Sequence, residues 1–193
     1  SGRINGADHP HTLLAGMTNV TTLSARGDYS AAVALGEDLT ARVSRVFGDP
    51  SAHYANALMA LGFAQERAGQ LDAAIASYEQ SLMGWRALPD GSDLNSATVL
   101  QQLGDIAMAK GETRVAIERY RDMMARNAGD RHAADPDLGQ RPLRLAKALI
   151  AAGECGEVAG LLAQARDRSK RAPTGHAVHS MLTEVEGQCP LAD

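Results

Sequence analysis

The feature that most constrains this chain is a set of glycines at equal spacing. Gly27, Gly69, Gly111 and Gly153 are each 42 residues apart in the 193-residue sequence. Similar residues follow each of them: a small aliphatic residue five positions later and, in two copies, a tyrosine nine positions later. These residues are Ala32, Ala74, Ala116 and Val158 at the first position, and Tyr78 and Tyr120 at the second. Equal intervals with matching neighbours indicate an internal repeat, which has to be recognised before any other feature is interpreted.

The segments on both sides of each glycine carry apolar residues at helical spacing, so each repeat predicts a pair of α-helices. The glycine lies where the first helix must end. A left-handed residue at that point costs glycine little and costs other residues about 1 kcal/mol or more. Small residues seven positions earlier (Gly62, Gly104 and Ala146) would let the axes of facing helices approach each other.

The predicted fold is all-α, with four helical hairpins and one further helix. The expected helix pairs cover residues 10–25 and 29–47, 52–68 and 71–88, 94–110 and 113–127, and 141–152 and 154–171. Prolines and helix-capping residues in the linkers support these boundaries. After Pro173, an apolar stripe that includes Val178, Leu182 and Val185 predicts a capping helix at about 176–186. The alternative is an unpacked amphipathic tail that binds a partner.

Composition agrees with helices and argues against some partners. Hydrophobic residues make up 45% of the chain and aromatic residues only 4%, which favours close-packed helices over a β-rich core. The net charge of −4 gives no general attraction to nucleic acid or to an anionic membrane, so we expect neither as a partner. No apolar run of about 18 residues predicts a membrane-spanning helix. Arginine outnumbers lysine sixteen to three, which suggests a GC-rich, bacterial coding sequence.

The pattern of a large apolar residue, a small one, a hinge glycine, a following alanine and a later aromatic resembles the tetratricopeptide repeat (TPR). A 42-residue period is similar to the kinesin light chain type of this repeat. That type often opens with a stretch like GADHPHTL at residues 6–13, although its usual Asn-Asn pair is absent here. The resemblance implies a right-handed superhelical solenoid and a single domain over residues 1–193, with repeats at about 10–47, 52–88, 94–127 and 141–171. It also suggests a fragment of a bacterial multi-domain protein.

In such repeats the first helices line a concave groove that holds a peptide or a partner segment, so the resemblance implies a protein-binding scaffold. Residues at helical spacing before the hinge glycines lie on that face. The predicted groove residues are Met17, Thr21, Asn56, Met59, Phe63, Glu66, Arg67, Gln101, Asp105, Met108, Leu143 and Lys147. The methionines and Phe63 would form an adaptable apolar strip, and the polar residues would bond a peptide. The competing interpretation is that the methionines complete the core.

Two other functions stay open. In the first, the chain is a regulatory or sensor domain of a larger enzyme or transcription regulator, such as a bacterial Ser/Thr kinase. In the second, it is a self-assembly module. The partner segment would lie in its own parent chain or in a second copy. We expect no enzyme, no catalytic residue, no cofactor and no metal, because no nucleotide-binding or metalloprotease motif occurs. His9 and His11 are the weak metal candidates, and the basic run 166–171 is explained by the helix dipole or, alternatively, by phosphate binding.

Two cysteines, Cys155 and Cys189, are too few for a disulfide framework. The favoured interpretation is two free thiols in a reducing compartment, so we expect a cytoplasmic protein. The alternative is one disulfide that fixes the C-terminal tail. The start at Ser1, without Met, suggests a segment of a longer protein.

Overall fold

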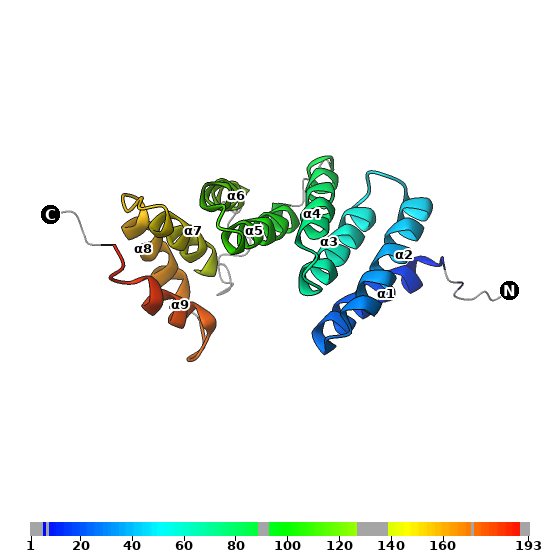
Figure 1. Cartoon of the computed structure of the whole chain (residues 1–193), viewed down its shortest axis with the longest axis horizontal. Coiled ribbons are helices and arrows are strands. Elements are labelled where there is room, and N and C mark those ends of the chain that lie inside the picture. The colour runs from blue at the N-terminus through cyan, green and yellow to red at the C-terminus, as the bar shows by residue number, and fades with distance from the viewer. Residues whose placement is uncertain (1–5, 7, 89–92, 127–138, 171, 190–193) are drawn as a thin grey trace. The chain divides into compact units, whose positions relative to one another are not determined.

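The computed structural model describes residues 6, 8–88, 93–126, 139–170 and 172–189. Within these ranges every regular element is a helix, which confirms the predicted all-α fold (Figure 1). The helices are α1 (Pro10–Arg26), α2 (Tyr29–Phe47), α3 (Ala52–Arg67), α4 (Leu71–Arg86), α5 (Asp93–Ala109), α6 (Thr113–Arg126), α7 (Gln140–Ala151), α8 (Val158–Ser169) and α9 (Ala177–Val185). The chain forms two compact units, unit 1 (Ser1–Val99) and unit 2 (Leu100–Asp193). The expected single domain over 1–193 stays a prediction.

Each hairpin turns at its equally spaced glycine, as the sequence predicts. The φ angles are 88° at Gly27, 75° at Gly69, 77° at Gly111 and 76° at Gly153. In every turn the amide after the glycine donates to the carbonyl five residues earlier, which is the backbone pattern that commonly ends a helix at glycine. The four bonds run from Asp28 to Leu23 (3.0 Å), from Gln70 to Gln65 (2.9 Å), from Glu112 to Ala107 (2.8 Å) and from Glu154 to Leu149 (2.8 Å).

In the second and third hairpins a tyrosine ring packs on a glycine of the first helix. A Cβ added to Gly62 would lie 2.8 Å from Cδ1 of Tyr78, and a Cβ added to Gly104 would clash with the ring of Tyr120. Tyr78 is 0% exposed and Tyr120 2% exposed. The small residue therefore creates the space that the large residue fills, as the repeat pattern predicts.

The core of unit 1 runs from the first hairpin into the second. Buried side chains of α1, α2 and α3 form one hydrophobic cluster, which includes Leu13, Val20, Val43 and Leu61. Helical glycines again permit close approach, since Gly36 on α2 faces the backbone and side chain of Leu61 on α3. Helix α3 packs against α1, α2 and α4. The first helices α1 and α3 are therefore neighbours, as the repeat architecture requires.

In unit 2, α7 packs against α6 and α8, and α9 packs against α7 and α8. The buried residues of α9 are Val178, Leu182 and Val185. The Cγ2 atom of Val178 would lie 3.1 Å from a Cβ added to Gly139, at the start of α7. These contacts confirm the predicted capping helix, and the alternative of an unpacked tail is wrong.

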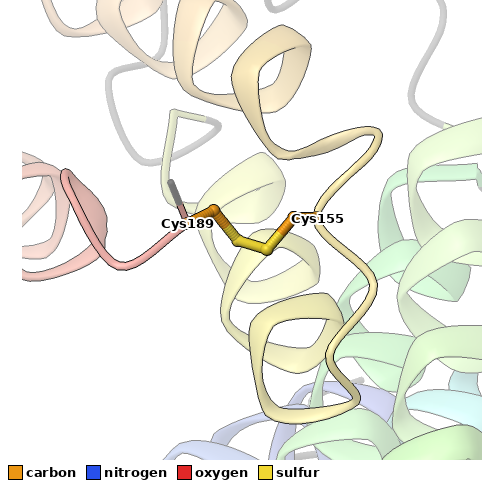
Figure 2. The surroundings of a disulfide bond; sticks show 2 residues. All are labelled: Cys155 and Cys189. Atoms are coloured by element: carbon orange, nitrogen blue, oxygen red, sulfur yellow. A yellow bond between two sulfur atoms is a disulfide. The ribbon is translucent and has the colours of Figure 1, made fainter. Parts of the chain in front are cut away.

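Two sequence expectations about unit 2 are wrong. Helix α8 begins at Val158 and not at residue 154, because residues 154–155 have no regular structure after the hinge and residues 156–157, with Gly156 among them, form a turn. The cysteines are also not free: Cys155 and Cys189 form a disulfide (Figure 2). The free-thiol interpretation failed because the chain after α9 returns to the α7–α8 turn, which residue counting could not show. Residues 89–92 and 127–138, which hold most of two predicted linkers, and Arg171 lie outside the described residues.

Candidate peptide-binding surface

The predicted groove residues of unit 1 lie on α1 and α3 and differ in exposure. Met17 on α1 is only 7% exposed, so its side chain belongs to the core, as the competing interpretation proposed. Thr21, one turn later, is exposed. On α3, the side chains of Asn56, Met59 and Phe63 are half-buried. Their spacing of three and four residues places them on one face of the helix. Of the predicted apolar groove residues in unit 1, the partly exposed ones, Met59 and Phe63, therefore both lie on α3.

Two charged groove residues at the end of α3 have partners within their own unit. Glu66 accepts a hydrogen bond from the hydroxyl of Tyr78, with 2.9 Å between Oε2 and Oη. The guanidinium of Arg67 lies 5.9 Å from the centroid of the Tyr29 ring, within the range of a cation–π interaction. Arg67 is nevertheless exposed. Glu66 thus mainly ties α3 to α4, whereas Arg67 still presents its charge to solvent.

In unit 2, Gln101, Asp105 and Met108 are half-buried on α5. Asp105 accepts from two donors: its Oδ1 lies 2.6 Å from the hydroxyl of Tyr120, and both its oxygens lie 2.7 Å from Nη1 of Arg144. The bonds join α5 to both α6 and α7. The main role of Asp105 is therefore to accept hydrogen bonds that hold these three helices together.

This network changes the ionisation of Tyr120. Burial of the ring raises the pKa of Tyr120 far above its usual value of 10.0, and the hydrogen bond to Asp105 and the charge of Asp105 raise it further. The positive charge of Arg144 opposes this only in part. Tyr120 is therefore a neutral hydrogen-bond donor in the folded protein at any ordinary pH.

The remaining groove residues lie on α7. Leu143 is 0% exposed, so it packs in the core of unit 2 and does not face a partner. Lys147 is half-buried, and its Nζ lies 2.6 Å from Oε2 of Glu184 on α9. The capping helix α9 thus supplies, through Glu184, the ion-pair partner of Lys147, which is the one lysine among the predicted groove residues. Sequence reasoning missed Arg144 and Glu184 because their roles depend on which residues of neighbouring helices face each other.

Of the two histidines considered as metal ligands, His9 has a structural role. The ring of His9 caps α1, since its Nδ1 accepts from the amide of His11 at 3.3 Å. Asp8 pairs with Arg42 at 2.8 Å, and Nδ1 of His176 caps α9. Among the described side chains, no group of three or more His, Cys, Asp or Glu residues is placed to hold a metal ion. Over the same residues, no helix combines the length and the apolar character needed to cross a lipid bilayer.

A succession of helix pairs, each reversed at a left-handed glycine and packed on a neighbouring pair of the same unit, defines an α-helical repeat protein. The sequence pattern of the tetratricopeptide repeat family matches residues 13–84 and 54–127, which together span more than half of the 193 residues. The chain belongs to the tetratricopeptide repeat family. No curated protein matches the sequence.

Solved structures of other repeat proteins share this fold. The nearly identical TPR-like repeats of a Podosopora anserina protein assigned as a kinesin light chain share 19% identity, with a TM-score of 0.74, over 93% of this chain and 88% of that chain. A single-substitution variant of that protein gives 20% identity and a TM-score of 0.75, over 96% and 89%. BtubC (BKLC) from P. vanneervenii gives 16% identity and a TM-score of 0.73, over 100% and 71%. At these identities the similarity shows the fold alone.

Proposed function

We propose that this chain is a protein-binding module that holds a peptide segment on the exposed face of α3. The observation that carries the proposal is the pair Met59 and Phe63, two large apolar side chains that stay half-buried on one helix face. A partner that covers them would gain free energy from apolar burial of about 25 cal/mol per Å². Repeats of this family generally serve as non-enzymatic scaffolds, and the proposed role is of that kind.

The residues around this pair suit an extended peptide. Asn56 offers an amide that can donate to and accept from a peptide backbone, and exposed Arg67 offers a positive charge to a carboxylate. Thr21 on the neighbouring helix α1 is exposed as well. A ligand with an apolar side chain next to an acidic residue would match this surface. Gln101, Met108 and Lys147 in unit 2 stay predictions of the same kind.

The test is selection of binding peptides from a random library, followed by affinity measurement on purified variants. We expect Phe63→Ala to weaken the selected peptide by about tenfold or more, because a central aromatic anchor is worth about 1.5–3 kcal/mol. Met83→Ala is the matched control, since Met83 is 62% exposed on the second helix α4 and lies outside the proposed surface. Equal affinity of both variants, with both folded, would contradict the proposal.

The source of the peptide distinguishes the remaining possibilities. A segment of the parent chain would make this module a regulatory or sensor domain, and a segment of a second copy would make it a self-assembly module. Light scattering over a concentration series detects a second copy as the source, and the sequence of the complete gene addresses the first case. The bacterial origin stays a prediction from the sequence. The cytoplasmic location also stays a prediction, but it loses the support of free thiols because Cys155 and Cys189 are bonded to each other.

A further inference from the structure

The disulfide links two points that are far apart in the sequence and adjacent in the fold. Cys155 lies in the turn between α7 and α8, and Cys189 lies in the short segment after α9 (Figure 2). The two Cα atoms are 5.7 Å apart, with 34 residues of sequence separation. The bond therefore closes a loop that contains all of α8 and α9, and it fastens the end of the capping helix to the last hairpin.

The other contacts described for α9 are a short apolar stripe and ion pairs at the surface. Helix α9 has nine residues, and a helix of that length is not stable alone in water. Its buried side chains are Val178, Leu182 and Val185. Its charged links to α7 and α8 are surface ion pairs: Glu184 with Lys147 at 2.6 Å and Glu186 with Arg166 at 3.0 Å. Exposed pairs of this kind contribute little to stability, so the covalent bond is the strongest single constraint on α9.

The disulfide is also reachable from solvent. A pocket of about 560 Å³ lies between α8 and the segment after α9, and both cysteines line it. Val158 and Leu162 on α8 form part of its wall, and both cysteines are half-buried. A disulfide buried in a tightly packed core would resist exchange, whereas a disulfide in the wall of a pocket offers its sulfurs to an attacking thiolate.

We propose that the Cys155–Cys189 disulfide is a redox switch that sets how firmly α9 is held on α7 and α8. A thiolate of a dithiol reductant attacks one sulfur, forms a mixed disulfide and releases the other cysteine as a thiolate. The second thiolate of the reductant then attacks the mixed disulfide and frees the remaining cysteine. Two electrons and two protons pass from the dithiol to the cysteine pair, and the reductant leaves as a cyclic disulfide.

Reduction removes the covalent link and leaves the other contacts of α9 available in the closed state. Without the covalent link, α9 is held by noncovalent contacts alone, among them three apolar side chains and the surface ion pairs, so it opens more often. Each opening uncovers the part of unit 2 that holds Gly139 and Lys147. The predicted groove residue Lys147 then loses Glu184 and gains access to a partner. The redox state would in this way control the surface at the end of the array.

The experiment treats the folded, oxidised protein with dithiothreitol under native conditions. Alkylation and mass spectrometry count the free thiols, and hydrogen exchange follows the amides of α9. We expect complete reduction without denaturant and exchange of the α9 amides that is about 10- to 100-fold faster, while the amides of α1 to α4 stay unchanged. If the bond is reduced only in denaturant, or if α9 exchanges at the same rate after reduction, the proposal is wrong.

Two variants serve as controls. The double variant Cys155→Ser with Cys189→Ser should show fast exchange of α9 from the start and no response to dithiothreitol. Lys147→Ala removes one ion pair and keeps the disulfide, so its α9 should exchange slowly until the reductant is added. Because reduction of the wild-type protein already gives a complete result, the conclusion does not depend on whether the double variant folds. A Lys147→Ala protein with fast exchange in the oxidised form would overturn the assignment of the bond as the main constraint.

Discussion

Asp105 shows how a residue that sequence spacing assigns to a binding face can serve the fold instead. It receives the hydroxyl of Tyr120 and the guanidinium of Arg144, and its side chain and that of Arg144 are each 26% exposed. The tyrosine could be found from the repeat pattern, because it recurs nine residues after the hinge. The arginine could not, because nothing in the spacing tells which residue of α7 faces α5. Binding by Asp105 would require a partner to compete with both donors.

Replacing Tyr120 with phenylalanine isolates this network. We expect Tyr120→Phe to lower the free energy of unfolding at pH 7 by about 1–3 kcal/mol, since a hydrogen bond to a charged acceptor is lost from a buried site. Chemical denaturation followed by circular dichroism measures the change. Tyr29→Phe, which removes a hydroxyl outside the network, should change the stability by less. Equal losses in the two variants would show that the hydrogen bond to Asp105 adds nothing beyond the loss of a hydroxyl group.

The same variant carries a pH signature. Because the pKa of Tyr120 is raised in the folded state, its contribution to stability is complete below about pH 10 and is lost as the pH rises further. As the pH rises, the unfolded chain releases the tyrosine proton first. Above about pH 10, this release lowers the free energy of unfolding by about 1.4 kcal/mol for each further pH unit. Phenylalanine has no proton to lose, so the gap between wild type and variant should narrow above pH 10. A constant gap from pH 7 to 11 would contradict this assignment.

At the scale of helices, the sequence predicts most of the boundaries because local chemistry sets them. Hinge glycines end the first helices, and second helices begin two residues later at Tyr29, Leu71 and Thr113. The fourth copy departs from the rule: α8 starts five residues after Gly153. There Gly156 weakens the first turn and Cys155 is held by the disulfide. A bond to a residue 34 positions away is a tertiary effect, which helical periodicity does not contain.

Two glycine-to-alanine substitutions test the packing of helices. At Gly62 a Cβ would meet the ring of Tyr78 at 2.8 Å, so we expect Gly62→Ala to cost about 1–3 kcal/mol through overpacking. At Gly160, on α8, nothing lies within 4 Å of the added atom, so Gly160→Ala should stabilise by up to about 1 kcal/mol through helix propensity. Urea unfolding compares the two variants. A gain in stability at Gly62 would show that the ring moves without cost.

For the whole molecule, the sequence predicts the number of repeats but not the division into unit 1 and unit 2. Equal spacing makes the four repeats look equivalent in the sequence. The division into two units depends on how many contacts each unit makes within itself, and spacing does not contain this information. Each repeat of an array is stabilised mainly by its neighbouring repeats. A change in one unit should therefore lower the stability of that unit more than the stability of the other. The disulfide lies in unit 2 and Trp85, the one tryptophan of the sequence, lies in unit 1 on α4.

This arrangement lets one sample report on both units. Reduction of the disulfide should destabilise unit 2 by about 3–4 kcal/mol, from the loop entropy of a bond that spans 34 residues. We expect the thermal transition seen by circular dichroism to broaden or split, because part of the helix signal comes from unit 2. The transition seen by fluorescence of buried Trp85 should shift much less. Equal shifts in both signals would mean that the whole chain unfolds as one cooperative block.

The glycines of these repeats follow two different substitution rules. At the four hinges no atom lies within 4 Å of the place that a Cβ would occupy, so only the positive φ excludes other residues. At Gly62 and Gly104 the constraint is volume, because a tyrosine ring fills the adjacent space. A larger residue at one of the two positions can be compensated by a smaller one at the other. Copy four has Ala146 in place of the glycine and Leu162 in place of the tyrosine. A neighbouring residue cannot compensate for a strained backbone torsion in the same way. As the sequences of such arrays diverge, the hinge glycine should therefore be the last of these features to be lost.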